Sequence, residues 1–161
     1  MKLFYSPGAC SLSPHIALHE LGVAHETIKV DLAKKLLPDG SDFRAINPRG
    51  QVPTLQLDDG TVLTEGPAIV QYLADQKPDS TLMPKNGTVE RSKAQSWLNY
   101  VSTELHKGYS PLFKPNTPDD YKTIARANLI AQYTYLDKEL ANRPYLNGDT
   151  FTAADAYLFV V

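Results

Sequence analysis

The stretch Lys2-Leu-Phe-Tyr-Ser-Pro-Gly-Ala-Cys-Ser-Leu-Ser-Pro14 decides how the N-terminal half folds. Its first five residues are typical of a short strand, and Pro7-Gly8 ends that strand because the fixed φ of proline and the missing side chain of glycine favour a turn. A helix is predicted from Ser13, since Pro14 suits the first turn and Gly22 provides the stop. The chain therefore begins with a strand, a loop and a helix.

More strands follow in the next fifty residues. Residues 25–32 alternate apolar and polar side chains, which predicts a second strand. Two strand-like runs flank the turn tripeptide Asp58-Asp59-Gly60 and predict a β-hairpin. A helix is expected from Gly66-Pro67 through Ala74. We therefore expect an α/β domain over residues 1–80, with a βαβ unit, a hairpin and a helix.

The second half of the sequence has almost no strand signal. Residues 77–87 combine prolines with Asp, Ser and Gly and are typical of a linker. Helices are expected over residues 88–107 and from Asp119 onward, with a proline-rich loop at residues 111–118 between them. The pattern predicts an all-helical domain over residues 87–161.

The C-terminal end carries one more helix signal. Phe151-Thr-Ala-Ala-Asp155 has a threonine N-cap with an acid three residues on, a variant of the capping box. The apolar run that follows stops at Val161, after barely two helical turns. We therefore expect a truncated chain and an incomplete helical domain.

Charge and cysteine content exclude several classes of protein. Sixteen basic and eighteen acidic residues give a formal net charge of −2, which argues against nucleic acid and membrane partners. The single cysteine, Cys10, excludes an internal disulfide and a zinc site built from several thiolates. No membrane span or secretory signal is visible. We expect a cytoplasmic protein whose partners are small molecules or other proteins.

Cys10 lies in the loop between the first strand and the first helix, where α/β folds place ligands. A lone cysteine is often a small buried hydrophobe, but a helix N-terminus favours a thiolate. A helix end alone stabilises the thiolate by only ~0.3–1 kcal/mol, too little to ionise the thiol near neutral pH. The N–H groups of Ser11 or Leu12, or a nearby cation, would have to stabilise it further. We prefer Cys10 as the reactive group to the hydroxyls of Tyr5 and Ser11. Serine at position 13 argues against dithiol chemistry within one chain.

Three other segments could hold a ligand, although each has a commoner structural explanation. Most X–Pro bonds such as Val52-Pro53 are trans. A cis bond here would present the Val52 N–H and C=O to an extended peptide, which could pair with them as an added strand does. Glu65 either stabilises a helix start or meets a ligand ammonium, while free N–H groups at Gly66 take a carboxylate. Lys35 is either solvated or pairs with a ligand carboxylate.

Polar residues also follow one face of the helix expected over residues 88–107. Asn99, Thr103 and His106 are separated by four and three positions, which places them on the same side of a regular helix. Most such polar faces are simply solvated. Their role in a binding site therefore depends on further evidence.

Three histidines, His15, His19 and His25, fall in the first helix and shortly after it. Their spacing with other ligand types is not typical of a metal site. We therefore interpret them as ordinary surface or core histidines and expect no metal.

Five segments resemble bacterial cytosolic glutathione S-transferases of the beta class, and together they span the whole chain. The segments are Met1–Leu12, Asn47–Leu55, Leu63–Ala74, Trp97–Gly108 and Phe151–Phe159. The resemblance implies a thioredoxin-like N-terminal domain, an all-helical C-terminal domain that continues past Val161, a homodimer, and glutathione as co-substrate.

The resemblance also implies roles for individual residues. It puts Cys10 beside the glutathione sulfur and Val52 on the cysteinyl backbone, with Pro53 cis. It puts Glu65 and Gly66 at the γ-glutamyl end, and Gly66 stands where most family members have serine. The resemblance also implies that one subunit completes the other's site, and it makes His106 a catalytic candidate. The further residues that it implies at the glutathione site are Lys35, Asn99, Thr103, Glu104, Leu105 and His106.

Three functions are compatible with these expectations. In the first, the site stabilises the glutathione thiolate, which attacks electrophilic small molecules and so detoxifies them. In the second, Cys10 forms a mixed disulfide with glutathione, and the protein is a thiol-disulfide reductase or a reductive dehalogenase. In the third, it is a non-catalytic ligand-binding protein on the same fold. The identity of the electrophile stays open.

Overall fold

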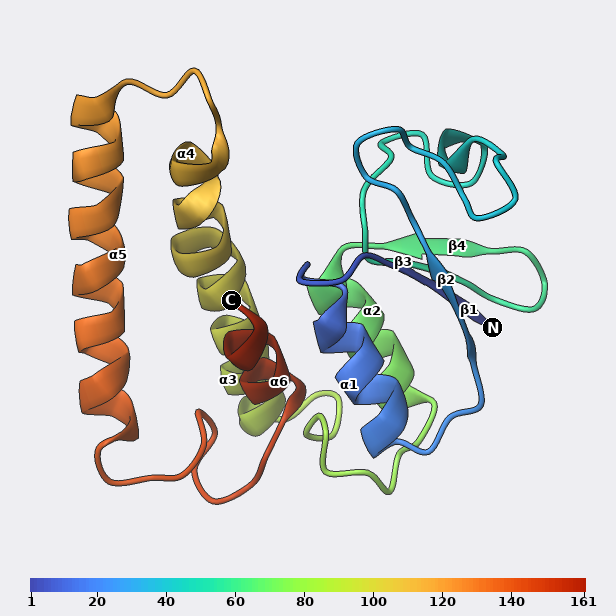
Figure 1. Cartoon of the computed structure of the whole chain (residues 1–161). Coiled ribbons are helices and arrows are strands. Elements are labelled where there is room, and N and C mark those ends of the chain that lie inside the picture. The colour runs from blue at the N-terminus through green and yellow to red at the C-terminus, as the bar shows by residue number, and fades with distance from the viewer. The chain divides into compact units, whose positions relative to one another are not determined.

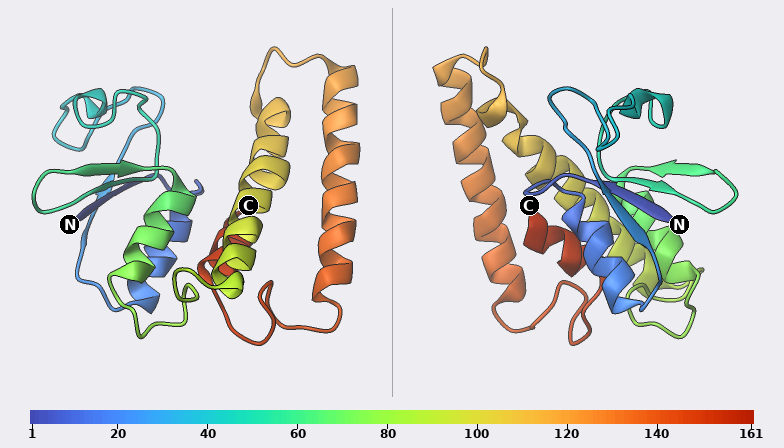
Figure 2. Two further views of the ribbon diagram at one scale, coloured as in Figure 1. Left: turned by 180° about the vertical axis from the view of Figure 1, so that it is seen from behind. Right: turned by 45° about the vertical axis from the view of Figure 1, so that its right-hand side comes forward.

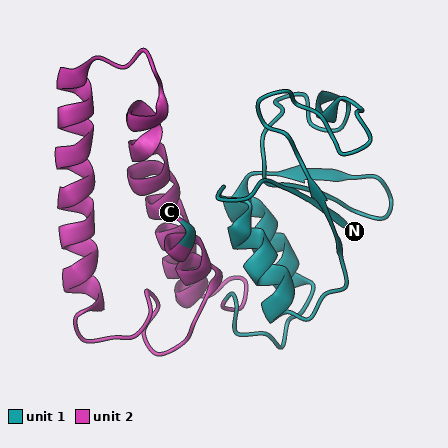
Figure 3. Cartoon of the chain, in the orientation of Figure 1, with its two compact units in different colours: residues 1–83, 160 teal, residues 84–159, 161 magenta.

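The computed structural model describes all 161 residues, which form two compact units (Figure 3). The first unit comprises residues 1–83 with Val160, and the second comprises residues 84–159 with Val161. The domain limits expected from the sequence, 1–80 and 87–161, stay a prediction about which segments fold independently. No helix is long and apolar enough to cross a membrane.

The first unit is built on a four-stranded sheet in the order β2-β1-β3-β4. Its strands are β1 (Lys2–Tyr5), β2 (Glu26–Lys29), β3 (Thr54–Gln56) and β4 (Val62–Thr64). β1 and β2 are parallel, and the other two pairs are antiparallel. A parallel pair needs a crossover, which helix α1 (Leu12–Glu20) provides. The predicted order of βαβ unit, hairpin and helix α2 (Gly66–Asp75) is confirmed.

The core of this unit lies on both faces of the sheet, because successive residues of a strand point to opposite faces. Phe4 packs with Val30 and with Phe43 of the short 3-10 helix η1 (Phe43–Ala45). Leu3 and its register partner Leu55 lie on the other face and are fully buried. Helices α1 and α2 lie side by side (Figure 1). The sheet therefore lies between the layer of α1 and α2 on one face and the segment that contains η1 on the other.

The second unit is all helical, as predicted. Its helices in chain order are α3 (Val89–Tyr100), the π-helix η2 (Val101–His106), the 3-10 helix η3 (Lys107–Tyr109), α4 (Ser110–Phe113), α5 (Asp119–Leu140) and α6 (Ala153–Val160). The first four follow one another without a break, and α5 runs beside them (Figure 2). Gly108 allows close approach, since a Cβ there would lie 2.9 Å from Leu129 Cδ2 on α5.

The prediction of a loop over residues 111–118 is wrong at its start. The helical chain continues to Phe113, and Pro111 lies in the first turn of α4. Proline is tolerated at that place because the Ser110 N–H already donates to the Lys107 carbonyl, to which residue 111 would otherwise donate in an α-helix. Only residues 114–118 connect to α5.

Two predicted helix starts are confirmed by their caps. Thr88 Oγ1 accepts a hydrogen bond of 3.2 Å from the Arg91 N–H. At α6, Asp155 Oδ2 accepts the Thr152 N–H at 2.8 Å, and Asp155 Oδ1 accepts the Leu146 N–H at 2.7 Å. Asp155 therefore fixes both the start of α6 and the loop that precedes it.

Candidate active site

The segment from Asn47 to Pro53 is held in shape by one buried amide. Asn47 is 3% exposed, and its Nδ2 donates to the Gln51 carbonyl and to Thr54 Oγ1, both at 2.9 Å. Thr54 Oγ1 donates in turn to the same carbonyl at 2.9 Å. The segment ends in a cis Val52-Pro53 bond, as predicted. Asn47 is a positioning residue that reasoning from the sequence missed.

Cys10 lies against this segment. Its Sγ donates to the Val52 carbonyl at 3.5 Å, and the side chain is partly exposed. The loop that carries Cys10 is closed by Ser11, whose buried hydroxyl accepts the Ser6 N–H at 3.1 Å and donates to the Ser6 carbonyl. Ser11 is therefore a structural hydroxyl. The Leu12 N–H donates to the Ala9 carbonyl at 3.1 Å, so it is not available to a thiolate.

Lys35 reaches the same segment from a tight turn. Asp31 Oδ1 accepts the N–H groups of Ala33 and Lys34, each at 3.0 Å. The hydrogen bond from the Lys34 N–H is the main reason that the pKa of Asp31 is lowered. The Lys35 N–H donates to the Asp31 carbonyl at 2.7 Å. From that turn Lys35 Nζ donates to the Gly50 carbonyl at 2.9 Å. An ammonium has three N–H donors, so a ligand carboxylate can bind to it as well.

Glu65 pairs with an arginine of the segment. Its Oε1 lies 2.8 Å from Arg49 Nη1, and Arg49 Nη2 donates to Thr64 Oγ1 at 2.9 Å. Both charged side chains are more than half exposed, so the pair contributes little to stability. Arg49 is a second residue that the sequence analysis missed, because its partner Glu65 lies sixteen positions later in the chain.

Gly66 begins α2 and faces the proline of the segment. A Cβ at this position would lie 3.7 Å from Pro53 Cγ, an ordinary van der Waals contact. Pro67 has no N–H, and the Ala68 N–H donates to the Glu65 carbonyl at 3.0 Å. The N–H of Gly66 is therefore the donor that this helix end offers to an anion.

Backbone strain marks two of these residues. Lys35 and Glu65, with φ of 60° and 68°, are the only non-glycine residues with positive φ. Such conformations cost of order 1–3 kcal/mol and cluster at ligand sites. The structure brings together the six candidate residues that the sequence assigned to this unit: Cys10, Lys35, Val52, Pro53, Glu65 and Gly66.

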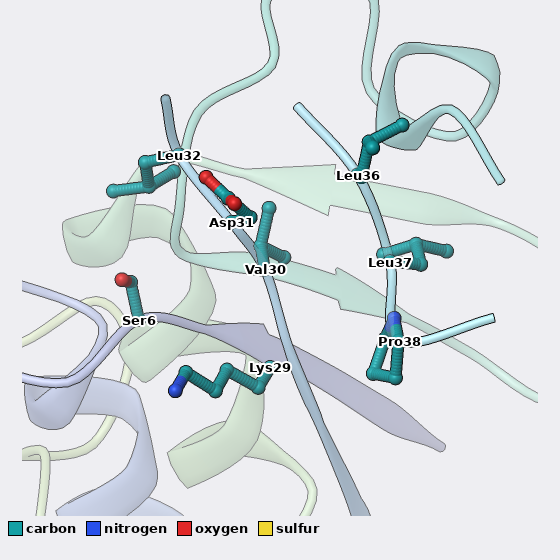
Figure 4. A pocket seen from close by; sticks show the side chains of 8 residues that line it. All are labelled: Ser6, Lys29, Val30, Asp31, Leu32, Leu36, Leu37 and Pro38. Carbon is teal, nitrogen blue, oxygen red and sulfur yellow. The ribbon is translucent and has the colours of Figure 1, made fainter. Parts of the chain in front are cut away.

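A pocket of about 430 Å³ lies in the same unit but is lined by other residues. Leu36, Leu37 and Pro38 form one side of it, and Lys29 and Ser6 lie across from them (Figure 4). Asp31, which shapes the turn before Lys35, also lines it. None of the six candidate residues does so. The candidate site is therefore the open surface around the segment and not this pocket.

The remaining candidates lie on α3 and on the π-helix η2 of the second unit. The Thr103 hydroxyl is 3.1 Å from the Asn99 carbonyl and 2.9 Å from Glu104 Oε1, and all three residues are exposed. Leu105 is fully buried, so only its backbone could meet a ligand. The π-helix has i→i+5 hydrogen bonds, so the regular spacing assumed for these residues does not hold beyond Tyr100.

His106 is oriented by a residue far away in the sequence. Its Nδ1 lies 2.7 Å from the hydroxyl of Tyr157 on α6, and the two rings meet edge to face. Tyr157 is 3% exposed, so its hydroxyl is a fixed partner. Nothing in the sequence pairs these two residues, which are 51 positions apart.

Two family models cover most of the chain. Residues 8–76 match the family model described as glutathione S-transferase, N-terminal domain, and residues 100–161 match that of the C-terminal domain. The whole chain is 53% identical to 80% of glutathione S-transferase GstA of Escherichia coli O157:H7.

Solved structures are similar over nearly the whole chain. A beta-class glutathione S-transferase of Sphingomonas chungbukensis is 50% identical with a TM-score of 0.94, over 99% of this chain and 80% of that one. A sphingomonad glutathione S-transferase complexed with glutathione is 49% identical with a TM-score of 0.95, over the same shares.

Proposed function

The chain belongs to the glutathione S-transferase family, and from that premise we propose that it conjugates the thiol of glutathione to electrophilic small molecules. The observation that carries this proposal is the convergence of Cys10, Lys35 and Glu65 on one segment that ends at Val52-Pro53. Each brings a different chemical group to the same peptide-sized surface. Detoxification is the physiological role that this reaction would serve.

The segment is suited to a peptide ligand. The Val52 N–H donates to no carbonyl of the chain, so an extended peptide can pair with it as an added strand does. The Lys35 ammonium then binds a carboxylate of glutathione. At the γ-glutamyl end, the Glu65 carboxylate receives the ammonium, and the N–H of Gly66 receives the carboxylate. The ammonium and one carboxylate of the tripeptide thus meet side chains of opposite charge, and the second carboxylate meets a backbone donor.

The chemical step belongs to glutathione. Bound in this way, its sulfur lies beside Cys10 at the start of α1, where the helix end favours a negative charge. The glutathione thiolate attacks the electrophilic carbon, a carbon–sulfur bond forms, and the leaving group departs with the electron pair. The protein's contribution is to hold the thiolate and bring it near the electrophile.

Replacing Cys10 tests this assignment of the nucleophile. We expect Cys10→Ala to lower conjugation but not to abolish it, since the attacking sulfur is that of glutathione. Initial rates with halogenated aromatics and epoxides, at fixed glutathione, measure this. S-methyl glutathione, which has no free thiol, is the control and should give no product. If the protein is retained on immobilised glutathione yet turns over none of these electrophiles, it is a binding protein instead.

A second candidate reaction uses the Cys10 thiol itself. Cys10 is partly exposed and lies at the surface proposed for the glutathione sulfur. Its thiolate would attack oxidised glutathione, form a mixed disulfide and release one glutathione thiolate. Mass spectrometry after incubation with oxidised glutathione distinguishes the two candidates. One glutathionyl adduct, absent from Cys10→Ala, supports disulfide reduction or reductive dehalogenation.

We also propose that Asn99, Thr103, Glu104, Leu105 and His106 complete the site, in a cytoplasmic homodimer. Family membership supports this assembly, in which each subunit would contribute to the other's site. Light scattering on the purified chain measures the mass. A monomeric mass at catalytic concentrations, with full activity, would contradict the dimer.

A further inference from the structure

Three histidine rings lie together on the first unit, outside the candidate active site. His15 and His19 are four positions apart on α1 and share one face of the helix. His25 comes from the residue before β2. Ring centroids are 4.8 Å apart for His15 and His19, 5.5 Å for His15 and His25, and 5.3 Å for His19 and His25. One nitrogen of each ring lies within 4.8 Å of those of the other two.

The end of α1 brings His25 back to the helix. Gly22 has a φ of 60°, and the Gly22 and Val23 N–H groups donate to the carbonyls of His19 and Leu18, each at 3.0 Å. This is the Schellman arrangement, which ends a helix and reverses the chain. Because the chain reverses there, His25 lies beside a ring that is six positions earlier.

The third histidine has a defined tautomer. His25 Nδ1 lies 2.7 Å from the Val23 carbonyl, and a carbonyl only accepts, so Nδ1 carries the hydrogen. Nε2 of the neutral ring then keeps its lone pair. A backbone carbonyl that orients the ring through its second nitrogen is the usual outer partner of a metal-binding histidine.

We propose that His15, His19 and His25 form a binding site for a divalent transition-metal ion such as Zn²⁺ or Cu²⁺. Tetrahedral zinc with Zn–N bonds of ~2.0–2.1 Å holds two ligand nitrogens roughly 3.3–3.4 Å apart. His15 Nε2 and His19 Nε2 are 3.2 Å apart, so an ion can bridge them almost without movement. His25 supplies the third ligand nitrogen, which lies within 4.8 Å of those of His15 and His19. Water takes the fourth, as in other three-histidine sites.

Electrostatics support the same assignment. Burial, and then the nearness of His19 and His25, lowers the pKa of His15 below its ordinary value. The neutral ring is the form that binds a metal. From the sequence we expected ordinary surface or core histidines and no metal. That expectation missed the grouping, because the spacing of the three histidines in the sequence does not show that the chain reverses after α1.

Metal titration tests the site directly. Calorimetry of the untagged full chain with Zn²⁺ should give one equivalent, and His19→Ala and His25→Ala should each weaken binding at least about tenfold. His19 is exposed, so His19→Ala should keep its circular dichroism. Cys10→Ser and Glu20→Gln are the matched controls and should bind like the parent chain. In parallel, Cu²⁺ bound to the parent chain should show hyperfine splitting from imidazole nitrogens by electron paramagnetic resonance.

Three results would contradict the proposed metal site. Loss of binding in Cys10→Ser, an unchanged titration in both histidine variants, or no saturation by Zn²⁺ would each overturn the site. None of these measurements uses glutathione or an electrophile. The metal site can therefore fail or stand whatever the outcome for the proposed transferase reaction.

Discussion

Asn47 shows how one buried side chain can shape a binding surface without touching the ligand. Its amide donates to Gln51 and Thr54 and accepts from the Arg49 N–H at 3.1 Å. Asn47→Ala takes one donor away from the buried Thr54 hydroxyl and leaves the Arg49 N–H without its acceptor, which should cost about 1–3 kcal/mol of unfolding free energy. Urea denaturation measures the loss. Asn128→Ala, an exposed asparagine on α5, is the control, and an equal effect in both variants would contradict the role of Asn47.

Replacing Gly66 by serine should strengthen the binding of glutathione. Gly66 lies in helical conformation, and a Cβ there meets only Pro53 at an ordinary distance, so Gly66→Ser should fold normally. A serine hydroxyl adds one hydrogen bond to the γ-glutamyl carboxylate, worth about 0.5–1.5 kcal/mol net, or roughly two- to tenfold in the KM for glutathione. Gly66→Ala adds the same Cβ without the hydroxyl. If serine and alanine change KM equally, the carboxylate is bound elsewhere.

At the scale of elements, Asp155 joins two pieces of the second unit. It caps α6 through Thr152 and also holds the Leu146 N–H of the preceding loop. Asp155→Ala removes a cap and leaves two N–H groups without their acceptor, so we expect a loss of about 1–3 kcal/mol. Thermal or urea unfolding measures it. Asp149→Ala, an exposed acid of the same loop, should change stability by less than about 0.5 kcal/mol.

The elements that the sequence predicts best are those with a local cause. The strand before Pro7, the hairpin at Asp58-Asp59-Gly60 and the cap at Thr152 each depend on neighbouring residues, and all are present. The π-helix at 101–106 was not predictable, since its hydrogen bonds differ from α-helical ones by one residue and no side chain marks the change. The continuation to Phe113 was missed because Pro111 reads as a break unless the helix restarts there.

The candidate site shows the same division. Cys10, Val52 and Glu65 stand at turns and helix starts, which local patterns can find. The residues missed were Arg49, Asn47 and Tyr157. Each has a partner distant in the sequence: Glu65 for Arg49, Thr54 for Asn47 and His106 for Tyr157. Pairings at such separations depend on how the chain packs, and a single sequence does not contain them.

At the scale of the whole molecule, binding of glutathione should raise the melting temperature, because a ligand that binds only the folded state stabilises it. At ten times the dissociation constant the gain is about 1.4 kcal/mol, or roughly 3–6 °C for a chain of this size. Differential scanning fluorimetry with reduced glutathione measures this shift without any electrophile, so it separates binding from turnover.

Two lysine variants make the thermal test specific to the site. Lys35 Nζ lies at the Gly50 carbonyl beside the proposed peptide surface, whereas Lys34 is exposed and next to it in the chain. Lys35→Met should therefore lose most of the glutathione-dependent shift, and Lys34→Met should keep it. Because each variant is compared with its own melting temperature without ligand, any general destabilisation cancels. Equal shifts of the melting temperature in both variants would mean that the ammonium of Lys35 does not bind the tripeptide. No shift in the parent chain would contradict the proposed glutathione site as a whole.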